Sequence, residues 1–163
     1  MTDKRLIRAV EIMPFTKIIR YEDMDIGTYL IGLNLRLEDG RVFTLVNIPY
    51  EVAEAIKLYN HGEPPPRRQS LFSLLMNHEE FIDAVARTLK RVVVDELDRE
   101  TNLYTATVEF SEDGLSLNVK MIPSHAIYLA LITGKPVYVA EDLVEQFSGE
   151  EEEYEIDDEE EEY

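Results

Sequence analysis

Hydrophobic and polar residues alternate along the first third of the chain with the period of two that marks β-strands. The alternation predicts three strands, over residues 6–13, 29–37 and 41–48. Asp39-Gly40 separates the last two, and Asp-Gly is a strong signal for a hairpin turn. Residues 14–27, which contain Pro14 and Gly27, predict a loop, with a short strand over 17–20 as the alternative.

After Pro49 the apolar residues change to the spacing of three and four that marks helices. This spacing predicts helices over residues 51–60, over 70–76, and in the segment that follows Asn77. Gly62 is expected to end the first helix and Ser70 to cap the second. Asn77, with Glu80 three residues later, predicts a capping box at the start of the third.

Strands return over residues 91–94, 103–110 and 115–122. Leu115 and Leu117 lie on the apolar side of the last alternation, so they are expected on a buried face. Ser124 is expected to cap a helix over 125–133 that is apolar nearly all round and therefore central and buried. Gly134 should end this helix, before a short strand over 137–139 and a helix over 142–147.

Strands grouped in hairpins, with helices between the groups, predict an α+β fold and not a doubly wound parallel sheet. We expect a single domain over residues 1–147, built on a mixed, largely antiparallel sheet with about four helices. Several strands would lie at sheet edges, and exposed edges favour pairing with another chain. The protein is therefore predicted to form a homo-oligomer.

Acidic residues concentrate after this domain. The chain of 163 residues has a formal net charge of −18, and residues 148–163, SGEEEEYEIDDEEEEY, hold 11 of its 34 acidic residues and no basic one. Residues 1–147 keep 23 acidic and 16 basic residues, a net charge of −7. Self-repulsion predicts a disordered acidic tail over 148–163. Such a tail would aid solubility, bind a basic protein, or compete with nucleic acid for the domain's own basic surface.

The composition excludes several classes of function. The chain has no Cys, which removes disulfides, thiolate nucleophiles and Cys-ligated metal centres. No segment approaches the ~18 consecutive apolar residues of a membrane span, and the first residues show no signal-peptide pattern. Glycine-rich phosphate loops are also missing, so no organic cofactor is expected. These observations predict a cytoplasmic protein without membrane contact.

His125 is the most informative of the three histidines. With Ser124 it stands at the expected start of the helix over 125–133, where free backbone N–H groups and the helix dipole favour an anion. A phosphate could bind beside Ser124, and the imidazole of His125 could then move protons. The alternative is an ordinary capping serine followed by a histidine that faces solvent.

A second group of candidate residues lies in VVVDELD, where Asp95, Glu96 and Asp98 follow an apolar run. Nucleases commonly hold a divalent metal with two or three such oxygens, and the metal activates water and neutralises the phosphate. Asp95 and Glu96 are therefore candidate ligands for Mg²⁺ or Mn²⁺, and Glu51 could complete the site. The alternative is a solvated acidic turn, with Glu51 placed to favour the positive end of a helix.

Basic residues are few and scattered. Arg67-Arg68 is one of three adjacent basic pairs and the candidate contact for phosphate. Aromatic residues are not interleaved with these pairs, and tight binding to DNA or RNA requires several clustered positive charges. Binding to DNA or RNA is therefore expected to be weak.

Three segments of the chain together resemble the bifunctional nuclease domain family. They are IPYEVAEAIKLYNHGEPPPRRQSLFSLL, RVVVDELDRETNLYTATVEF and PSHAIYLALITGKPVYVAEDLVE, and the last is the most similar to the family pattern. The order and spacing of all three agree with that pattern, and the resemblance runs from about residue 6 to residue 147. It implies an α+β fold with a mixed sheet and nuclease action on DNA and RNA.

The resemblance also extends to individual positions of the family pattern. Glu51 matches a Glu of the family pattern, Glu96 aligns with its Asp after a Val-Val strand, and Ser124 matches directly. Family members usually carry Asp at the position of His125 and Arg at that of Ile122. Where the family has Thr-His-Asp, this chain has Leu71-Phe72-Ser73.

Two hypotheses of function follow. In the first, the chain is a metal-assisted phosphodiesterase that cleaves DNA or RNA, with Glu51 and Glu96 as metal ligands and His125 as proton donor or phosphate contact. In the second, the same fold serves as a non-catalytic interaction or regulatory module, and the acidic tail recruits a partner. The replaced polar positions and the low positive charge favour the second.

Overall fold

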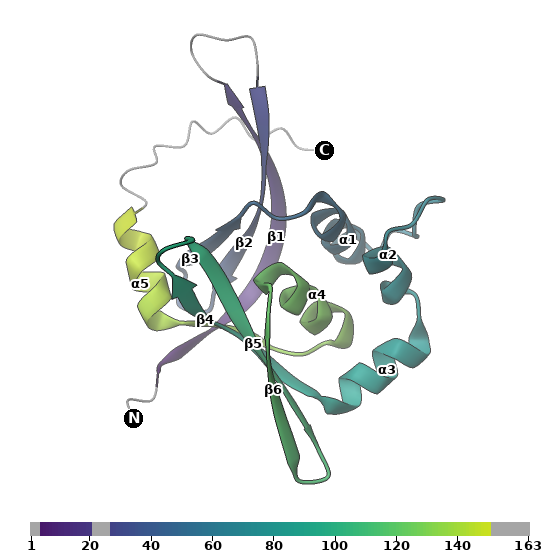
Figure 1. Cartoon of the computed structure of the whole chain (residues 1–163). Coiled ribbons are helices and arrows are strands. Elements are labelled where there is room, and N and C mark those ends of the chain that lie inside the picture. Colours follow the sequence, from purple (N-terminus) through teal and green to yellow (C-terminus); the bar gives the residue numbers. More distant parts are fainter. Residues whose placement is uncertain (1–3, 21–26, 151–163) are drawn as a thin grey trace.

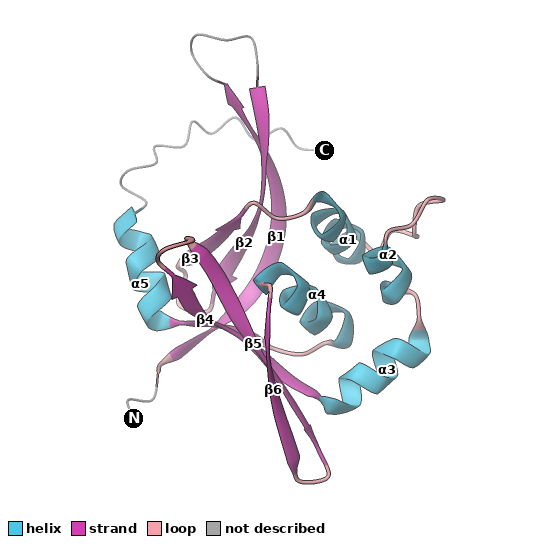
Figure 2. Ribbon diagram, viewed as in Figure 1, coloured by secondary structure: helices cyan, strands magenta, loops and turns pink. Residues whose placement is uncertain are grey.

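A computed structural model describes residues 4–20 and 27–150. It has the α+β fold that the sequence predicts, with one open, mostly antiparallel sheet of seven strands in the order β3-β2-β1-β7-β4-β5-β6 (Figures 1 and 2). The strands are β1 Leu6–Arg20, β2 Gly27–Leu37, β3 Val42–Val46, β4 Leu89–Asp98, β5 Leu103–Glu112, β6 Leu115–Met121 and β7 Val137–Ala140. The helices are α1 Tyr50–His61, α2 Leu71–Met76, α3 Glu79–Thr88, α4 Pro123–Thr133 and α5 Glu141–Glu150.

The sheet consists of two antiparallel meanders joined by one short strand. β1, β2 and β3 form the first meander, and β4, β5 and β6 form the second. β7 lies between them, antiparallel to β1 and parallel to β4. The sheet curves enough for the ring of Phe43 on β3 to lie 5.2 Å from that of Tyr104 on β5. Phe147 of α5 packs on Phe43 as well, so α5 covers the opening between the two meanders.

The predicted hairpin between β2 and β3 is confirmed. Gly40 has φ +92°, a conformation that side chains with a Cβ rarely adopt. The Asp39 carboxylate accepts a hydrogen bond from the backbone N–H of Arg41 at 3.0 Å and also pairs with its guanidinium. The Arg41 guanidinium holds the pKa of Asp39 below its ordinary value. The turn residues therefore stabilise this hairpin locally.

The loop predicted over residues 14–16 is wrong, because β1 continues as a strand to Arg20 and pairs with β2 throughout. The short strand considered over residues 17–20 is confirmed as the end of β1. Pro14 is opposite Leu33 within this ladder. β7 pairs only with Leu6–Arg8, so among the described residues no strand pairs with β1 on that side at Pro14. A missing N–H on an unpaired edge costs no ladder hydrogen bond. Residues 21–26 of the predicted loop lie outside the described residues.

Helix α4 forms the centre of the core, as its apolar sequence predicts. Ala126, Ile127, Tyr128 and Ala130 are each at most 1% exposed. The helix packs against β4 and β5 on the concave side of the sheet, and α1 packs beside it (Figure 1). Gly134 ends the helix in the left-handed conformation that the sequence predicts.

The helix starts differ from two predictions. Ser70 does cap α2, and its hydroxyl accepts from the N–H of Ser73. Asn77, in contrast, ends α2, and His78 caps α3 by accepting from the N–H of Phe81 through Nδ1. The predicted capping box at Asn77 is therefore wrong, since an imidazole nitrogen performs the same role one residue later.

The predicted cap of α4 is wrong as well. The helix begins at Pro123, with Ile122 at the N-cap position and no side-chain cap hydrogen bond. Proline is well suited to the first helical position, because its fixed φ matches the helix and its missing N–H is not needed there. Ser124 consequently lies inside the first turn, where it is 1% exposed.

The prediction that the apolar side of β6 is buried is wrong for Leu115 and Leu117. Leu115 and Leu117 are 78% and 61% exposed, although they share a sheet face with the buried Ala106 and Val108 of β5. The β5–β6 hairpin extends beyond the helices that cover this face nearer the centre of the sheet (Figure 1). Alternation identified the correct face, but the covering layer ends before the strand does.

The C-terminal part of the described chain is helical. Helix α5 ends at Glu150, so residues 148–150 of the predicted tail belong to this helix, and residues 151–163 lie outside the described residues. Within the part of the chain that the structure covers, no helix has the length and apolar character needed to cross a membrane.

Candidate functional site

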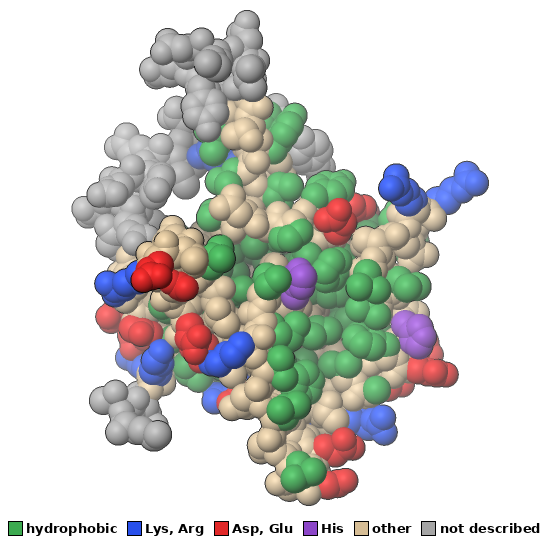
Figure 3. Space-filling view, in the orientation of Figure 1, with side chains coloured by type: hydrophobic (Ala, Val, Ile, Leu, Met, Phe, Trp, Pro, Cys, Tyr) green, Lys and Arg blue, Asp and Glu red, His purple; other side chains and the backbone are tan. Residues whose placement is uncertain are grey.

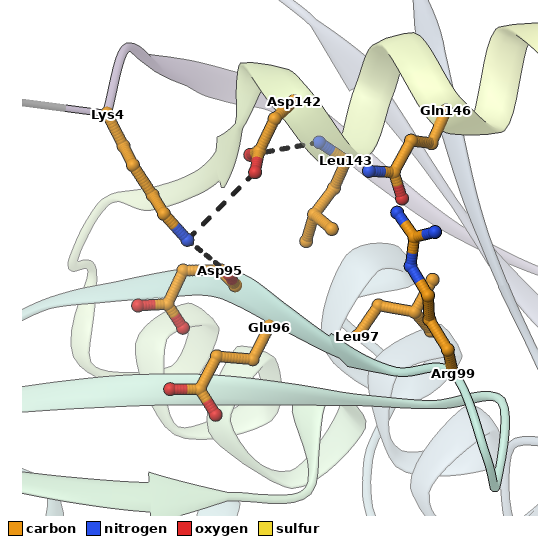
Figure 4. Close-up of a pocket in the computed structure, with 8 residues that line it drawn as sticks. All are labelled: Lys4, Asp95, Glu96, Leu97, Arg99, Asp142, Leu143 and Gln146. Atoms are coloured by element: carbon orange, nitrogen blue, oxygen red, sulfur yellow. Dashed lines mark hydrogen bonds and ion pairs between the residues drawn. The ribbon is translucent and has the colours of Figure 1, made fainter. Parts of the chain in front are cut away.

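Asp95 and Glu96 lie inside strand β4, and a β-bulge brings their side chains together. Val94 is opposite Ala106 and Glu96 is opposite Thr105, so two steps on β4 match one step on β5 and Asp95 is the extra residue. Successive side chains of a regular strand point to opposite faces, whereas a bulge re-aims one of them. The side chains of Asp95 and Glu96 extend to the same side in Figure 4.

The two acidic residues line a small pocket beyond the part of β4 that pairs with β7. Its volume is about 250 Å³. The chain leaves the sheet after β7 to form α5, and the pocket lies between the first turns of α5 and the end of β4 (Figure 4). Its walls come from three segments that are distant in sequence, with the lining residues Lys4, Asp95, Glu96, Leu97, Arg99, Asp142, Leu143 and Gln146.

A compact hydrogen-bond network holds the two carboxylates. The Thr107 hydroxyl on β5 lies 3.0 Å from both oxygens of Asp95. The ammonium of Lys120 on β6 donates to the Thr107 oxygen and to a carboxylate oxygen of Glu96, both at 2.7 Å. The hydrogen bond with Glu96 is the main cause of the raised pKa of Lys120. Three neighbouring strands thus fix a cation between two acids.

Two further cations line the opposite wall. The Lys4 ammonium donates to the backbone oxygen of Asp95 at 3.0 Å and lies 4.0 Å from the Asp142 carboxylate. The guanidinium of Arg99 extends toward Gln146 on α5 (Figure 4). Among the residues described, Arg99 has no ion pair. The pocket therefore combines a guanidinium that has no ion pair with a described residue and the three carboxylates of Asp95, Glu96 and Asp142.

Asp98, the third acid of the predicted group, has a structural role. Its carboxylate accepts hydrogen bonds from the N–H groups of Glu100 and Thr101, at 2.9 and 3.4 Å. These bonds stabilise the turn that connects β4 with β5, as short acidic side chains commonly do. Asp98 does not line the pocket.

Glu51 does not join Asp95 and Glu96. It lies exposed in the first turn of α1 and is absent from the pocket lining. In the described ranges no three or more His, Asp or Glu side chains are grouped so that they could hold a metal ion. Asp142 also lines the pocket, but its carboxylate lies 4.0 Å from the Lys4 ammonium and forms no metal-binding group with Asp95 and Glu96.

Ser124 and His125 lie in a different part of the molecule, where α2 meets α4. The Ser124 hydroxyl is buried and has no hydrogen-bond partner in the part of the chain that the structure describes. The His125 ring lies 5.0 Å from the ring of Phe72, edge to face. Tyr128 packs on Phe72 from one helical turn further along and donates its hydroxyl to the Phe72 carbonyl. Ser124 and His125 are thus neighbours of an aromatic cluster, and neither lines the carboxylate pocket.

Arg67 and Arg68 lie in the segment between α1 and α2. Both are exposed, and neither forms an ion pair with a described residue. Neither arginine lines the carboxylate pocket.

Several residues that line the pocket or hold its carboxylates could not be assigned from the sequence. Lys120 and Thr107 become partners of the acids only through the register of β5 and β6. Lys4 and Asp142 are brought near by the pairing of β1 with β7, which joins residues 6 and 140. A local signal did exist for Thr107, since a Thr within an apolar strand requires a hydrogen-bond partner when buried.

The sequence model of the bifunctional nuclease domain family matches residues 33–152, well over half of the chain. The chain therefore belongs to this family, which confirms the resemblance noted from the three sequence segments. The match includes the carboxylate pair on β4 and the α2–α4 contact, and it begins after the long strand β1. A search of curated proteins found no significant match.

Proposed function

We propose that the chain is a nuclease that hydrolyses phosphodiester bonds of DNA or RNA at the pocket formed by Asp95 and Glu96. The observation that supports this proposal is the β-bulge, which places two successive carboxylates on one side of a strand at a pocket lined by cations. Bulges frequently lie beside active sites, where they direct a side chain that a regular strand would turn away. Membership of the family supports the same class of substrate.

The carboxylate pair fits Mg²⁺ or Mn²⁺ in the type and number of its oxygen donors. Mg²⁺ commonly takes one or two protein carboxylates and completes its shell with water and substrate phosphate. When bound, such an ion supplies a water activated for attack and neutralises charge on the phosphate. The metal must compete with Lys120, whose ammonium already contacts Glu96 at 2.7 Å.

The residues of the opposite wall suit the nucleic-acid backbone. Arg99 has no ion pair to break within the described residues, and its guanidinium can bind phosphate oxygens in a bidentate manner. Lys4 would hold the adjacent phosphate as a point charge. Since the chain carries a net charge of −18, binding should be weak and should weaken further with salt.

A metal role for Glu51, a proton-transfer role for His125 and phosphate contacts by Ser124, Arg67 and Arg68 stay predictions. None of these residues lines the pocket proposed here. Variants of Glu51 and His125 consequently belong in the same assay. Loss of cleavage in these variants, with cleavage kept in the variants of Asp95 and Glu96, would place the reaction outside the pocket.

Purified full-length protein would be assayed on single-stranded DNA, duplex DNA and RNA with Mg²⁺ or Mn²⁺. Asp95→Asn and Glu96→Gln should each reduce cleavage by about 100-fold or more, the effect of losing several kcal/mol of charge stabilisation. Glu109→Gln is the matched control, because Glu109 is a carboxylate on β5 that pairs with Arg91 outside the pocket. Equal loss in the control, or loss in Glu51→Gln with full activity in Glu96→Gln, would contradict this site.

The α2–α4 contact favours a second function, a non-catalytic interaction module. Positions where the family usually has Thr-His-Asp and Asp hold Leu71-Phe72-Ser73 and His125 here, and Phe72 packs against His125. Leu71, Leu74 and Ile122 around this contact are 66%, 51% and 59% exposed. In Figure 3 hydrophobic side chains gather over α1, α2 and α4. An exposed apolar surface of this kind is typical of a binding site.

In this second function, the acidic segment after α5 would recruit a basic protein. A lysine-rich peptide should bind the full chain in a salt-dependent manner and lose most of its affinity for a chain that ends at residue 150. If the natural protein cleaves none of the DNA and RNA substrates and its peptide binding depends on the tail, the interaction module would be favoured over the nuclease. Undiminished peptide binding after truncation would argue against recruitment by the tail.

A further inference from the structure

The outer edge of β6 is a second surface of interest, separate from the pocket formed by Asp95 and Glu96. β6 is the last strand of the sheet, and within the described residues only β5 pairs with it. Its outward N–H and C=O groups are therefore available to another strand. The other edge strand, β3, has five residues against seven and is covered by α5, whose Phe147 contacts Phe43.

The residues of β6 include few of the features that usually protect an edge. The strand reads Leu-Ser-Leu-Asn-Val-Lys-Met, with Lys120 as its single charge. The ammonium of Lys120 is engaged with Glu96 and Thr107, on the sheet face that also carries the carboxylates. Natural edges are more often protected by several charges, a proline or a bulge. An uncharged strand with exposed Leu115 and Leu117 favours pairing.

The pattern of β6 is self-complementary about Asn118. Leu115, Leu117, Val119 and Met121 alternate with Ser116, Asn118 and Lys120, and the order of apolar and polar positions is the same in both directions. In an antiparallel pair centred on Asn118, all seven residues find a partner. Leu117 then meets Val119, and Leu115 meets Met121. Apolar residues directly opposite each other stabilise such a pair.

We propose that two copies of the chain form a symmetric dimer through antiparallel pairing of their β6 strands, centred on Asn118. The occupant of the edge is a second copy because β6, read in reverse, supplies an apolar partner for each of its own four apolar residues. Each copy would cover the exposed Leu115 and Leu117 of the other, and the two seven-stranded sheets would become continuous across a twofold axis. The two Asn118 amides would meet at this axis.

Mass measurement in solution tests the dimer. Full-length protein should be a dimer by light scattering or sedimentation, and Leu117→Glu should shift it to a monomer because it places a charge against the apolar partner residue. Val46→Glu on β3 is the matched control, since Val46 is 51% exposed on the other edge strand. The control should remain a dimer. A monomeric full-length protein, or a dimer that survives Leu117→Glu, would overturn the proposal.

Disulfide formation tests the register, and the absence of natural Cys makes the result unambiguous. Residues directly opposite in antiparallel strands have Cα atoms about 4.5–5.5 Å apart, within the range that a disulfide spans. Asn118→Cys should therefore form a covalent dimer on mild oxidation. Ser116→Cys should not, because the two copies of residue 116 would lie about 14 Å apart along the strands. Cross-linking of Ser116→Cys in preference to Asn118→Cys would reject this register.

Discussion

The pocket on β4 and the contact between α2 and α4 contain the two groups of residues in which the sequence suggested chemistry, and they differ in construction. At the pocket, polar side chains from three neighbouring strands satisfy one another, with Thr107 and Lys120 holding Asp95 and Glu96. At the helix contact, the Phe72 ring packs on both His125 and Tyr128, and the Ser124 hydroxyl has no hydrogen-bond partner among the described residues. The comparison indicates that the β4 pocket is organised for charged ligands and the α2–α4 contact for apolar packing.

Phe72→Ala should have the largest effect on stability, because the ring packs on both His125 and Tyr128. We expect a loss of about 2–3 kcal/mol in the free energy of unfolding, somewhat below the value for a fully buried ring. Leu74→Ala on the same helix is the control, since Leu74 is 51% exposed. Urea unfolding measures both, and equal losses would mean that the α2–α4 contact is not a packing centre.

Thr107→Val should act on the pocket with little change in side-chain volume. The substitution leaves the half-buried Asp95 carboxylate without its hydroxyl donor and removes one acceptor from Lys120. Hydrogen bonds to charged groups suggest a cost of about 1–2 kcal/mol. Thr105 lies on β5 like Thr107 and is opposite Glu96, and Thr105→Val should lower the stability by less. A thermal melt that ranks the two variants in the reverse order would contradict the network.

Tyr128→Phe should lower stability by about 1 kcal/mol at neutral pH, through loss of the hydrogen bond to the Phe72 carbonyl. Burial raises the pKa of Tyr128 from 10.0 to about 12, so the folded protein keeps this proton at a pH where the unfolded chain loses it. The contribution is complete below pH 10 and is lost as pH rises toward 12.

The difference in the free energy of unfolding between the natural protein and Tyr128→Phe should therefore become smaller as pH rises from 10 to 12. Urea unfolding of both proteins at several pH values would show it. A constant difference would mean that the phenol ionises equally readily in the folded and unfolded chains.

Ser124→Ala should give the smallest effect, with the opposite sign. Removing a buried hydroxyl that has no partner should raise the free energy of unfolding by up to about 1 kcal/mol. Ser73→Ala is the matched control, because Ser73 is equally buried but donates to the Ser70 carbonyl at 3.1 Å, and it should lose stability. Destabilisation by Ser124→Ala, measured by the same melt, would indicate that this hydroxyl has a partner in solution.

Features determined within a few residues were predicted correctly from the sequence. Asp39-Gly40 identified a hairpin, Gly62 and Gly134 identified helix ends, and Ser70 identified a cap, because each depends on local backbone preferences. The centre of the core at α4 was also predictable, since the helix is apolar on every side. Local rules failed at Asn77 and Ser124, where a neighbouring residue could perform the same role.

Features determined by distant partners were not predictable. The strand β1 continues through Pro14 because β7 pairs with only three of its residues. Asp95 and Glu96 share a face because β5 imposes a bulge, which leaves no mark in the order of the residues. The sequence therefore identified the carboxylate pair, but the network of Lys120, Thr107, Lys4 and Arg99 around it required the register of the sheet.

The short strand β7 has a consequence for the order of folding. Each meander is made of local hairpins, whereas β7 joins Leu6 to Ala140 across almost the whole described chain. Contacts between residues so distant in sequence carry a large loop-closure entropy and usually form late. The two meanders can therefore acquire native pairing independently, and their union waits for β7, which follows both of them in the sequence. The carboxylate pocket, whose walls require this union, should be among the last parts of the protein to form.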